Sequence, residues 1–279
     1  MTDARETPSA RLVVAGRDIV VEGPAGASPR ETLVLIHGWP DTLRVWDGTV
    51  AALAERWRCV RFTLPGFDAA DAPRAHTLAE ITELIHQVVR HAGGGAPVTL
   101  VLHDWGCLYG YHFANQHPEL VARIAGVDIG DATSRAMRDS LSAKAKAMVA
   151  FYQLWLALTW RLLPLGRGLA DGMARWMARL MHVRTAQAEI RAAMGYPYWI
   201  TWTGSHGSHR AVRTLQPRWP VFFCYGERKP MMFHSPSWAA ELATQPGCRV
   251  QGFRTGHWVM LDAKEAFHAA LRDWLEATA

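Results

Sequence analysis

The chain has 279 residues, of which 49% are hydrophobic and 20% are charged. This composition is typical of a globular protein and excludes a disordered one. Thirty Lys and Arg against 25 Asp and Glu give a net charge of +5. The basic residues dominate between residues 132 and 217, but they form no run. We therefore expect a solvated basic surface and no nucleic-acid binding.

The four cysteines are widely separated and form no CxxC pair, which argues against a zinc site and a disulfide framework. They are Cys59, Cys107, Cys224 and Cys248. We expect no metal and no cofactor. The N-terminal run MTDARETPSA has no apolar core, so it is not a secretory signal, and we expect a cytoplasmic protein.

Short apolar runs alternate with helical patterns along most of the chain. Residues 11–14 and 18–21 predict an opening hairpin, and further strands are expected at 32–36, 59–62, 98–102, 124–129, 221–225 and 249–253. Helices are expected at 46–57, 77–91, 107–116 and 263–276. The alternation predicts an α/β fold with a mostly parallel sheet covered by helices on both faces.

The alternation stops between residues 132 and 217, where the pattern is helical and rich in Trp and Met. This predicts a helical cap at 132–217, inserted into a core domain formed by 1–131 and 218–279, over the carboxyl ends of the strands. Residues 148–165 are almost wholly apolar apart from Gln153, Arg161 and Pro164. We interpret them as a cap helix over an apolar pocket, with membrane contact as a less favoured alternative.

The strongest local pattern is the run from Val98 to Gly110, in which a buried strand enters a helix through the turn His103-Asp104-Trp105-Gly106. In a nucleophile elbow, small residues flank the nucleophile because strand and helix approach closely. Gly106 fits this requirement and Leu102 does not. The alternative is that Asp104 only caps the helix, because Asp is a good N-cap residue.

Two further turns follow apolar strands. The first is His37-Gly38-Trp39-Pro40, where the backbone N–H of Trp39, with that of Trp105, could form an oxyanion hole. An ordinary strand-to-helix turn would look the same. The second carries His257, one of 13 histidines, after the last predicted strand. Its place in the chain order, after the predicted nucleophile, makes it the candidate general base.

Together these three elements resemble the α/β-hydrolase superfamily, and specifically its aspartate-nucleophile branch of epoxide hydrolases and haloalkane dehalogenases. The resemblance covers nearly the whole chain and implies an eight-stranded sheet with an inserted helical cap. It also implies that Asp104 is the nucleophile, that His257 activates water, and that Trp39 and Trp105 supply the oxyanion-hole amides. A carboxylate suits attack on an sp³ carbon because it needs no deprotonation at neutral pH.

The acid that orients the histidine departs from the family pattern. The resemblance places it three residues after the glycine that follows strand seven, and that position holds Lys229. One group of dehalogenases instead carries its acid at the end of strand six, where this chain has Asp128, and this match favours dehalogenation. Asp128 is our prediction, with Glu227 and Asp131 as alternatives.

The leaving group decides between two hydrolytic activities. Epoxide opening needs an acid, which the family supplies from cap tyrosines; Tyr152 and Tyr198 match that pair best, and Tyr196 is a third candidate, although aromatic packing would explain all three. His37 is a further candidate for contact with the substrate or leaving group. A haloalkane dehalogenase would instead hold a halide with N–H donors such as the Trp105 indole.

Epoxide hydrolysis is our first expectation and dehalogenation the second. A non-catalytic or repurposed ligand-binding protein is the alternative from a different class, favoured by Leu102 and Lys229. The Trp- and Met-rich cap predicts a small apolar or aromatic substrate, and contact with a membrane is not expected.

Overall fold

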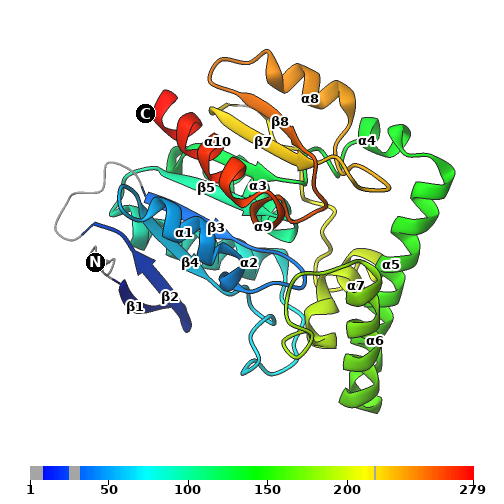
Figure 1. Cartoon of the computed structure of the whole chain (residues 1–279). Helices are drawn as coiled ribbons and strands as arrows, with labels where there is room; N and C mark the ends of the chain where they lie inside the picture. The colour runs from blue at the N-terminus through cyan, green and yellow to red at the C-terminus, as the bar shows by residue number, and fades with distance from the viewer. Residues whose placement is uncertain (1–8, 25–31, 217) are drawn as a thin grey trace, which may run out of the picture.

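A computed structural model describes residues 9–24, 32–216 and 218–279 of the chain (Figure 1). Eight strands form one sheet in the order β1-β2-β4-β3-β5-β6-β7-β8. Strands β1 and β2 pair antiparallel to their neighbours, and all later pairs are parallel. The strands are β1 (Ser9–Val14), β2 (Arg17–Glu22), β3 (Thr32–Ile36), β4 (Arg58–Phe62), β5 (Val98–His103), β6 (Val121–Val127), β7 (Val221–Gly226) and β8 (Arg249–Phe253). The predicted mostly parallel α/β fold is confirmed.

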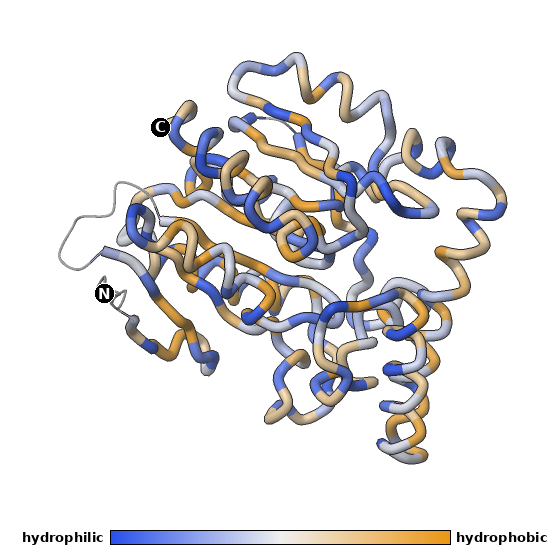
Figure 2. Tube along the Cα trace, viewed as in Figure 1, coloured by the Kyte–Doolittle hydropathy of each residue, from blue (hydrophilic) through white to orange (hydrophobic). Residues whose placement is uncertain are grey.

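Helices cover both faces of this sheet. Successive strand residues alternate between the faces, so Leu33 and Leu35 pack with α1, α9 and α10, whereas Val34 and Ile36 pack with α2 and α3. These helices are α1 (Asp47–Leu53), α2 (Leu78–Gly93), α3 (Trp105–Gln116), α8 (Pro236–Ala243), α9 (Val259–Asp262) and α10 (Lys264–Ala277). Figure 2 shows the central strands as predominantly hydrophobic, as expected for a sheet buried on both sides.

Four helices lie on the side of the molecule beyond the carboxyl ends of the strands, where α5, α6 and α7 pack together and α4 lies beside α8 (Figure 1). They are α4 (Arg135–Ser140), α5 (Ala143–Leu162), α6 (Arg167–Leu180) and α7 (Tyr196–Thr203). Short 3₁₀ helices complete the chain: η1 (Leu43–Trp46), η2 (Pro118–Leu120), η3 (Leu163–Leu165) and η4 (Ala192–Gly195). Among the described residues from 132 to 216, all regular elements are helical, and we call this segment the helical insertion.

Helix α5 is the long apolar segment noted in the sequence. Residues Ala143–Leu165 are long and apolar enough to cross a membrane by length and composition, and 17% of that window is buried. One side of α5 packs against α6 and α7 and contributes Tyr152 to a cavity. The opposite side exposes Phe151, Leu154 and Leu158 to solvent.

Two differences from the predicted elements concern β6 and α8. Strand β6 ends at Val127, so Asp128 follows the strand instead of lying within it. Helix α8 was not expected, because its eight residues follow a Pro- and Met-rich stretch without a helical apolar pattern. The N-terminal segment that we judged not to be a secretory signal lies mostly outside the described residues.

Candidate active site

Asp104 occupies a sharp turn between β5 and α3. Its backbone has φ 52° and ψ −121°, a conformation that residues with a side chain rarely adopt. Helix and strand approach so closely that a Cβ on Gly106 would lie 2.2 Å from the carbonyl oxygen of Ile36. The Asp104 side chain forms no capping hydrogen bond to α3, so helix capping does not account for this residue.

Leu102, which is large for its place before the elbow, is accommodated by a glycine on the helix. Leu102 is fully buried. A Cβ on Gly110 of α3 would lie 2.5 Å from both methyl carbons of Leu102. In this elbow the small residue that lets strand and helix approach closely is therefore Gly110 on the helix, and not the residue before Asp104 on the strand.

The turn after β3 contacts the Asp104 carboxylate directly. The backbone N–H of Trp39 donates a hydrogen bond to Asp104 Oδ1 at 2.7 Å. Gly38 makes this approach possible, since a Cβ there would lie 2.2 Å from Asp104 Oδ1 and 2.4 Å from the backbone nitrogen of Trp105. The amides of Trp39 and Trp105 thus lie on the same side of Asp104, as the oxyanion-hole hypothesis requires.

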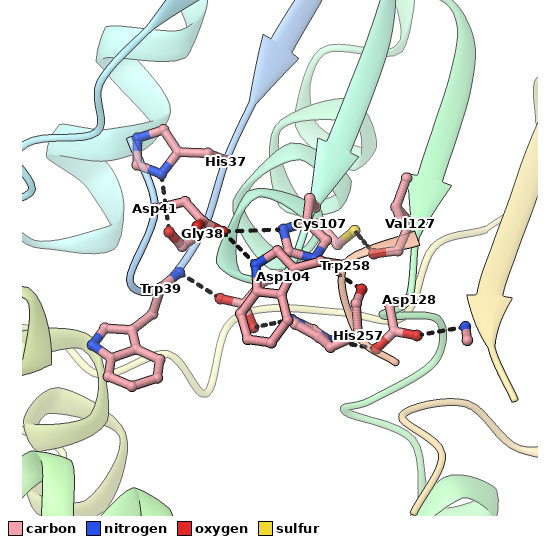
Figure 3. A network of polar contacts seen from close by, with 12 residues as sticks. His37, Gly38, Trp39, Asp41, Asp104, Cys107, Val127, Asp128, His257 and Trp258 are labelled. Carbon is pink, nitrogen blue, oxygen red and sulfur yellow. Dashed lines mark hydrogen bonds and ion pairs between the residues drawn. The ribbon is translucent and has the colours of Figure 1, made fainter. Parts of the chain in front are cut away.

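His257 lies between two carboxylates (Figure 3). Its Nε2 atom is 3.5 Å from Asp104 Oδ2, and its Nδ1 atom contacts Asp128 Oδ2. The other oxygen of Asp128 accepts hydrogen bonds from the backbone N–H of Gly226, at 3.0 Å, and from the Lys229 ammonium. The structure therefore brings together Asp104, His257 and Asp128. Lys229, which stands where the family resemblance implies the acid, contacts Asp128.

The two alternative acids lie elsewhere. Glu227 is exposed and has no contact with His257 in the described part of the chain. Asp131 accepts hydrogen bonds from the backbone N–H and hydroxyl of Ser235, at 2.6 and 2.7 Å, and from the Ser134 hydroxyl at 2.6 Å. Ser134 and Ser235 are the N-caps of α4 and α8, so Asp131 holds the starts of two helices.

The charges of this cluster depend on one another. Burial disfavours the imidazolium of His257, but the Asp128 and Asp104 carboxylates outweigh burial and raise the pKa of His257 to about 9. Burial likewise opposes ionisation of Asp128, yet the Lys229 ammonium and His257 hold its pKa below the usual value. His257 also lowers the pKa of Asp104 against the effect of burial. Asp104 is therefore ionised at neutral pH, as a nucleophile must be.

A second buried polar group lies behind the histidine and was not predicted. Asp41 is 1% exposed, accepts a hydrogen bond from Trp258 Nε1 at 3.0 Å and contacts the Thr185 hydroxyl. His103 Nδ1 lies 3.7 Å from Asp41, and His103 Nε2 lies 3.3 Å from the carbonyl oxygen of His257. This network holds the backbone of His257. The only signal in the sequence was an acidic residue just after an apolar strand.

A cavity of about 650 Å³ opens above Asp104, between the elbow and the helical insertion. Trp105, Tyr152 and Tyr198 line it together with Asp104. The Tyr198 ring packs edge-on against Trp105 and Trp39, with centroids 5.2 and 6.0 Å apart, and against Tyr152 at 6.0 Å. Three phenol side chains, those of Tyr109, Tyr152 and Tyr198, therefore share the cavity with the carboxylate.

Two candidate substrate contacts are corrected by the structure. Tyr196 is fully buried against Phe67 of the core and Trp160 of the insertion and does not line the cavity, so it packs between these two parts of the chain. His37 is also fully buried; its Nδ1 atom lies 3.0 Å from the carbonyl of Gly38, and its Nε2 accepts from the backbone N–H of Leu64 at 2.9 Å. His37 therefore fixes the turn that presents Trp39 and does not face the substrate.

Among the residues that the structure describes, no group of three or more His, Cys, Asp or Glu side chains is arranged to hold a metal ion. Around the Asp104 carboxylate lie the His257 imidazole, the backbone amides of Trp39 and Trp105, and phenols that line the cavity. This set can carry out attack by a carboxylate followed by attack of an activated water.

Comparison with known proteins agrees with this geometry. A family model described as the alpha/beta hydrolase fold matches residues 31–264. Epoxide hydrolase 1 of Caenorhabditis elegans is 29% identical over 102 residues, which cover 36% of this chain and 25% of that protein. The chain spans only 13% to 36% of the length of the curated relatives that it matches.

Two solved structures share the fold over nearly their whole length. The epoxide hydrolase of Bacillus megaterium superimposes with a TM-score of 0.69 at 19% identity, covering 96% of this chain and 100% of that one. A loop variant of the haloalkane dehalogenase from Bradyrhizobium elkanii superimposes with a TM-score of 0.64 at 18% identity, covering 98% and 97%. The fold is thus common to both activities.

Proposed function

Because this chain belongs to the α/β-hydrolase fold family, we propose that it is an epoxide hydrolase that opens its substrate through an ester on Asp104. The observation that carries the proposal is the placement of Tyr198 and Tyr152 in the same cavity as the Asp104 carboxylate. The sequence similarity to an epoxide hydrolase of Caenorhabditis elegans supports it.

In the first step, a carboxylate oxygen of Asp104 attacks one epoxide carbon, and the ring C–O bond breaks. The electron pair of that bond leaves on the alkoxide oxygen, which needs a proton donor. Burial and the negative charge of Asp104 raise the pKa of Tyr198 well above its usual value, and burial likewise raises that of Tyr152. Both phenols are therefore protonated hydrogen-bond donors at neutral pH, which suits them to bind and protonate the alkoxide.

In the second step, His257 takes a proton from water, and the hydroxide attacks the carbonyl carbon of the Asp104 ester. The N–H groups of Trp39 and Trp105 stabilise the tetrahedral oxyanion, an effect worth about 3–4 kcal/mol for one such donor in other hydrolases. The ester C–O bond then breaks, and the departing oxygen takes the proton of the newly added hydroxyl group, which releases the diol and the Asp104 carboxylate. The proton held by His257 returns to the tyrosinate left by the first step, which restores both groups. Asp128 holds the His257 imidazolium that forms meanwhile.

Dehalogenation is a second candidate, because Asp128 supplies the acid from the end of β6, as the sequence resemblance implied for one group of dehalogenases. The halide would need a second N–H donor beside the Trp105 indole. The Trp39 indole extends away from the Asp104 carboxylate (Figure 3), so it does not provide that donor. This difference favours the epoxide.

The experiment is paired turnover. The protein is incubated with an aryl epoxide and with a 1-haloalkane, and diol and halide release are measured. Diol release is expected, together with its loss in the Tyr198→Phe variant and its retention in the Tyr196→Phe variant, since Tyr198 lines the cavity and Tyr196 does not. Halide release without diol would replace the proposal with the dehalogenase, and neither product would favour the repurposed, non-catalytic alternative.

A further inference from the structure

Three arginines line the cavity that contains Asp104: Arg138, Arg210 and Arg213. Arg138 lies on α4, where the helical insertion begins, and the other two lie near its end. Among the described residues that line this cavity, Asp104 is the single acid. The cavity therefore has one carboxylate at its base and three guanidinium groups along the walls that the insertion provides.

Printed contacts connect the two segments that carry these arginines. Arg138 donates a hydrogen bond to the carbonyl oxygen of Thr133 at 3.0 Å. The Thr133 hydroxyl in turn lies 3.3 Å from the hydroxyl of Thr214, the residue next to Arg213. The start and the end of the insertion thus meet at Thr133 and Thr214, so Arg138 and Arg213 lie on segments in contact with each other, and all three arginines line the same cavity.

These cations have no acidic partner within the described part of the chain. Neither Arg138, Arg210 nor Arg213 forms an ion pair there, and Asp139, next to Arg138, pairs with Arg135 at 3.3 Å instead. Residues 132–217 contain twelve Lys and Arg and three Asp and Glu, a net +9, whereas the remaining residues carry −4. The field of the insertion therefore attracts anions to the cavity.

We propose that Arg138, Arg210 and Arg213 form a subsite for a carboxylate at one end of the substrate. Resting on the proposed function, this makes the substrate an epoxide with an apolar body and an anionic end. Leu141 and Val149 line the same cavity and suit the apolar body. Repulsion from the Asp104 carboxylate disfavours the reversed orientation, so the same charges that bind the acid also direct the reactive carbon toward the nucleophile.

The three side chains are exposed, so each contributes modestly and salt weakens its effect. For the three together we expect roughly tenfold tighter binding of an acid than of its uncharged analogue at low ionic strength. Guanidinium groups suit this ligand because they bind carboxylates through paired N–H donors.

Calorimetry tests the subsite without relying on turnover. Binding of a medium-chain fatty acid and of the primary alcohol of equal length is measured at low and at high salt. The acid should bind roughly tenfold more tightly, and high salt should remove the difference. Equal affinities for acid and alcohol at low salt would overturn the subsite. Diol release from a neutral epoxide would meanwhile still support the proposed function, so the two can fail separately.

A triple variant assigns the effect to the residues. Replacing Arg138, Arg210 and Arg213 with glutamine should abolish the preference for the acid. The matched control replaces three exposed cations of the insertion outside the cavity, Lys144, Arg161 and Arg167, with glutamine, and it should retain the preference. If the preference survives the first triple variant, or is lost equally in both, then the cavity arginines are not the subsite.

Discussion

The ammonium of Lys229 and the carboxylate of Asp128 form a buried ion pair, with 7% and 0% of the side chains exposed. Lys229 contacts one oxygen of Asp128, and His257 contacts the other. Lys229 occupies the position where the family resemblance implies an acid. In the proposed mechanism, Asp128 at the end of β6 is the acid, and the Lys229 cation beside it partly offsets the negative charge that reaches the histidine.

This pair makes a prediction about pH. Hydrolysis of the ester needs a neutral imidazole, so its rate rises as pH passes upward through the pKa of His257. Two carboxylates raise that pKa to about 9, and esterification of Asp104 removes the charge of one of them. Replacing Lys229 with methionine removes a cation, so Asp128 stabilises the imidazolium more strongly. The pH range over which the rate of ester hydrolysis rises should therefore shift upward by roughly one unit.

Arg228 provides the control for this variant, because it is the neighbouring cation but is exposed. Arg228→Met should leave the pH profile unchanged. The measurement is single-turnover decay of the ester intermediate across pH. A shift to lower pH, or the same shift in both variants, would mean that Lys229 does not act on His257 through Asp128.

The position of the acid makes a second prediction. Asp128→Asn should lower turnover by at least about a hundredfold, because the imidazolium loses its carboxylate partner. Glu227→Gln should leave turnover nearly unchanged, since Glu227 does not contact His257. The double variant Asp128→Asn with Lys229→Asp returns the acid to the loop after β7 and should recover part of the lost rate. If Glu227→Gln abolished turnover, the catalytic acid would be Glu227 and not Asp128.

The elbow makes a prediction about stability. Gly110→Ala should destabilise the protein by about 1–3 kcal/mol, because the added Cβ would lie 2.5 Å from the methyl groups of Leu102. Leu102→Ala removes the methyl groups that cause this clash. The loss of stability in the double variant should therefore be smaller than the sum of the losses in the two single variants. Denaturant unfolding of the four proteins measures this. Additive costs would show that the two residues do not compete for the same space.

Much of the fold could be predicted because local patterns decide it. Apolar runs predicted the strands. The turn sequences around Gly38 and Gly106 predicted the places where backbone segments approach one another closely. Asp128 could be proposed because the resemblance to one group of dehalogenases implied an acid at the end of strand six, and an acid there needs a partner to be buried.

The rest depends on contacts between residues distant in the sequence. Leu102 is too large for an elbow by its sequence alone, and only the structure shows that Gly110 on the facing helix makes room for it. Lys229 stands where the resemblance implies an acid, and only the structure shows that it contacts Asp128. Tyr196 and Tyr198 differ by two positions, yet Tyr196 packs between the insertion and the core domain, whereas Tyr198 lines the cavity. The family resemblance favoured Tyr198, but no physical pattern in the sequence distinguishes the two, because the direction of the helix relative to the core decides which ring faces Asp104.

The central claim is the ester on Asp104, and intact-mass measurement of the His257→Gln variant tests it most directly. Without its base, the variant should form the ester and fail to hydrolyse it. Incubation with an epoxide that the unaltered protein converts should add the full mass of that epoxide, and peptide mapping should place it on Asp104. The Asp104→Asn, His257→Gln double variant should show no adduct. Absence of any adduct in His257→Gln, or an adduct on another residue, would contradict the account.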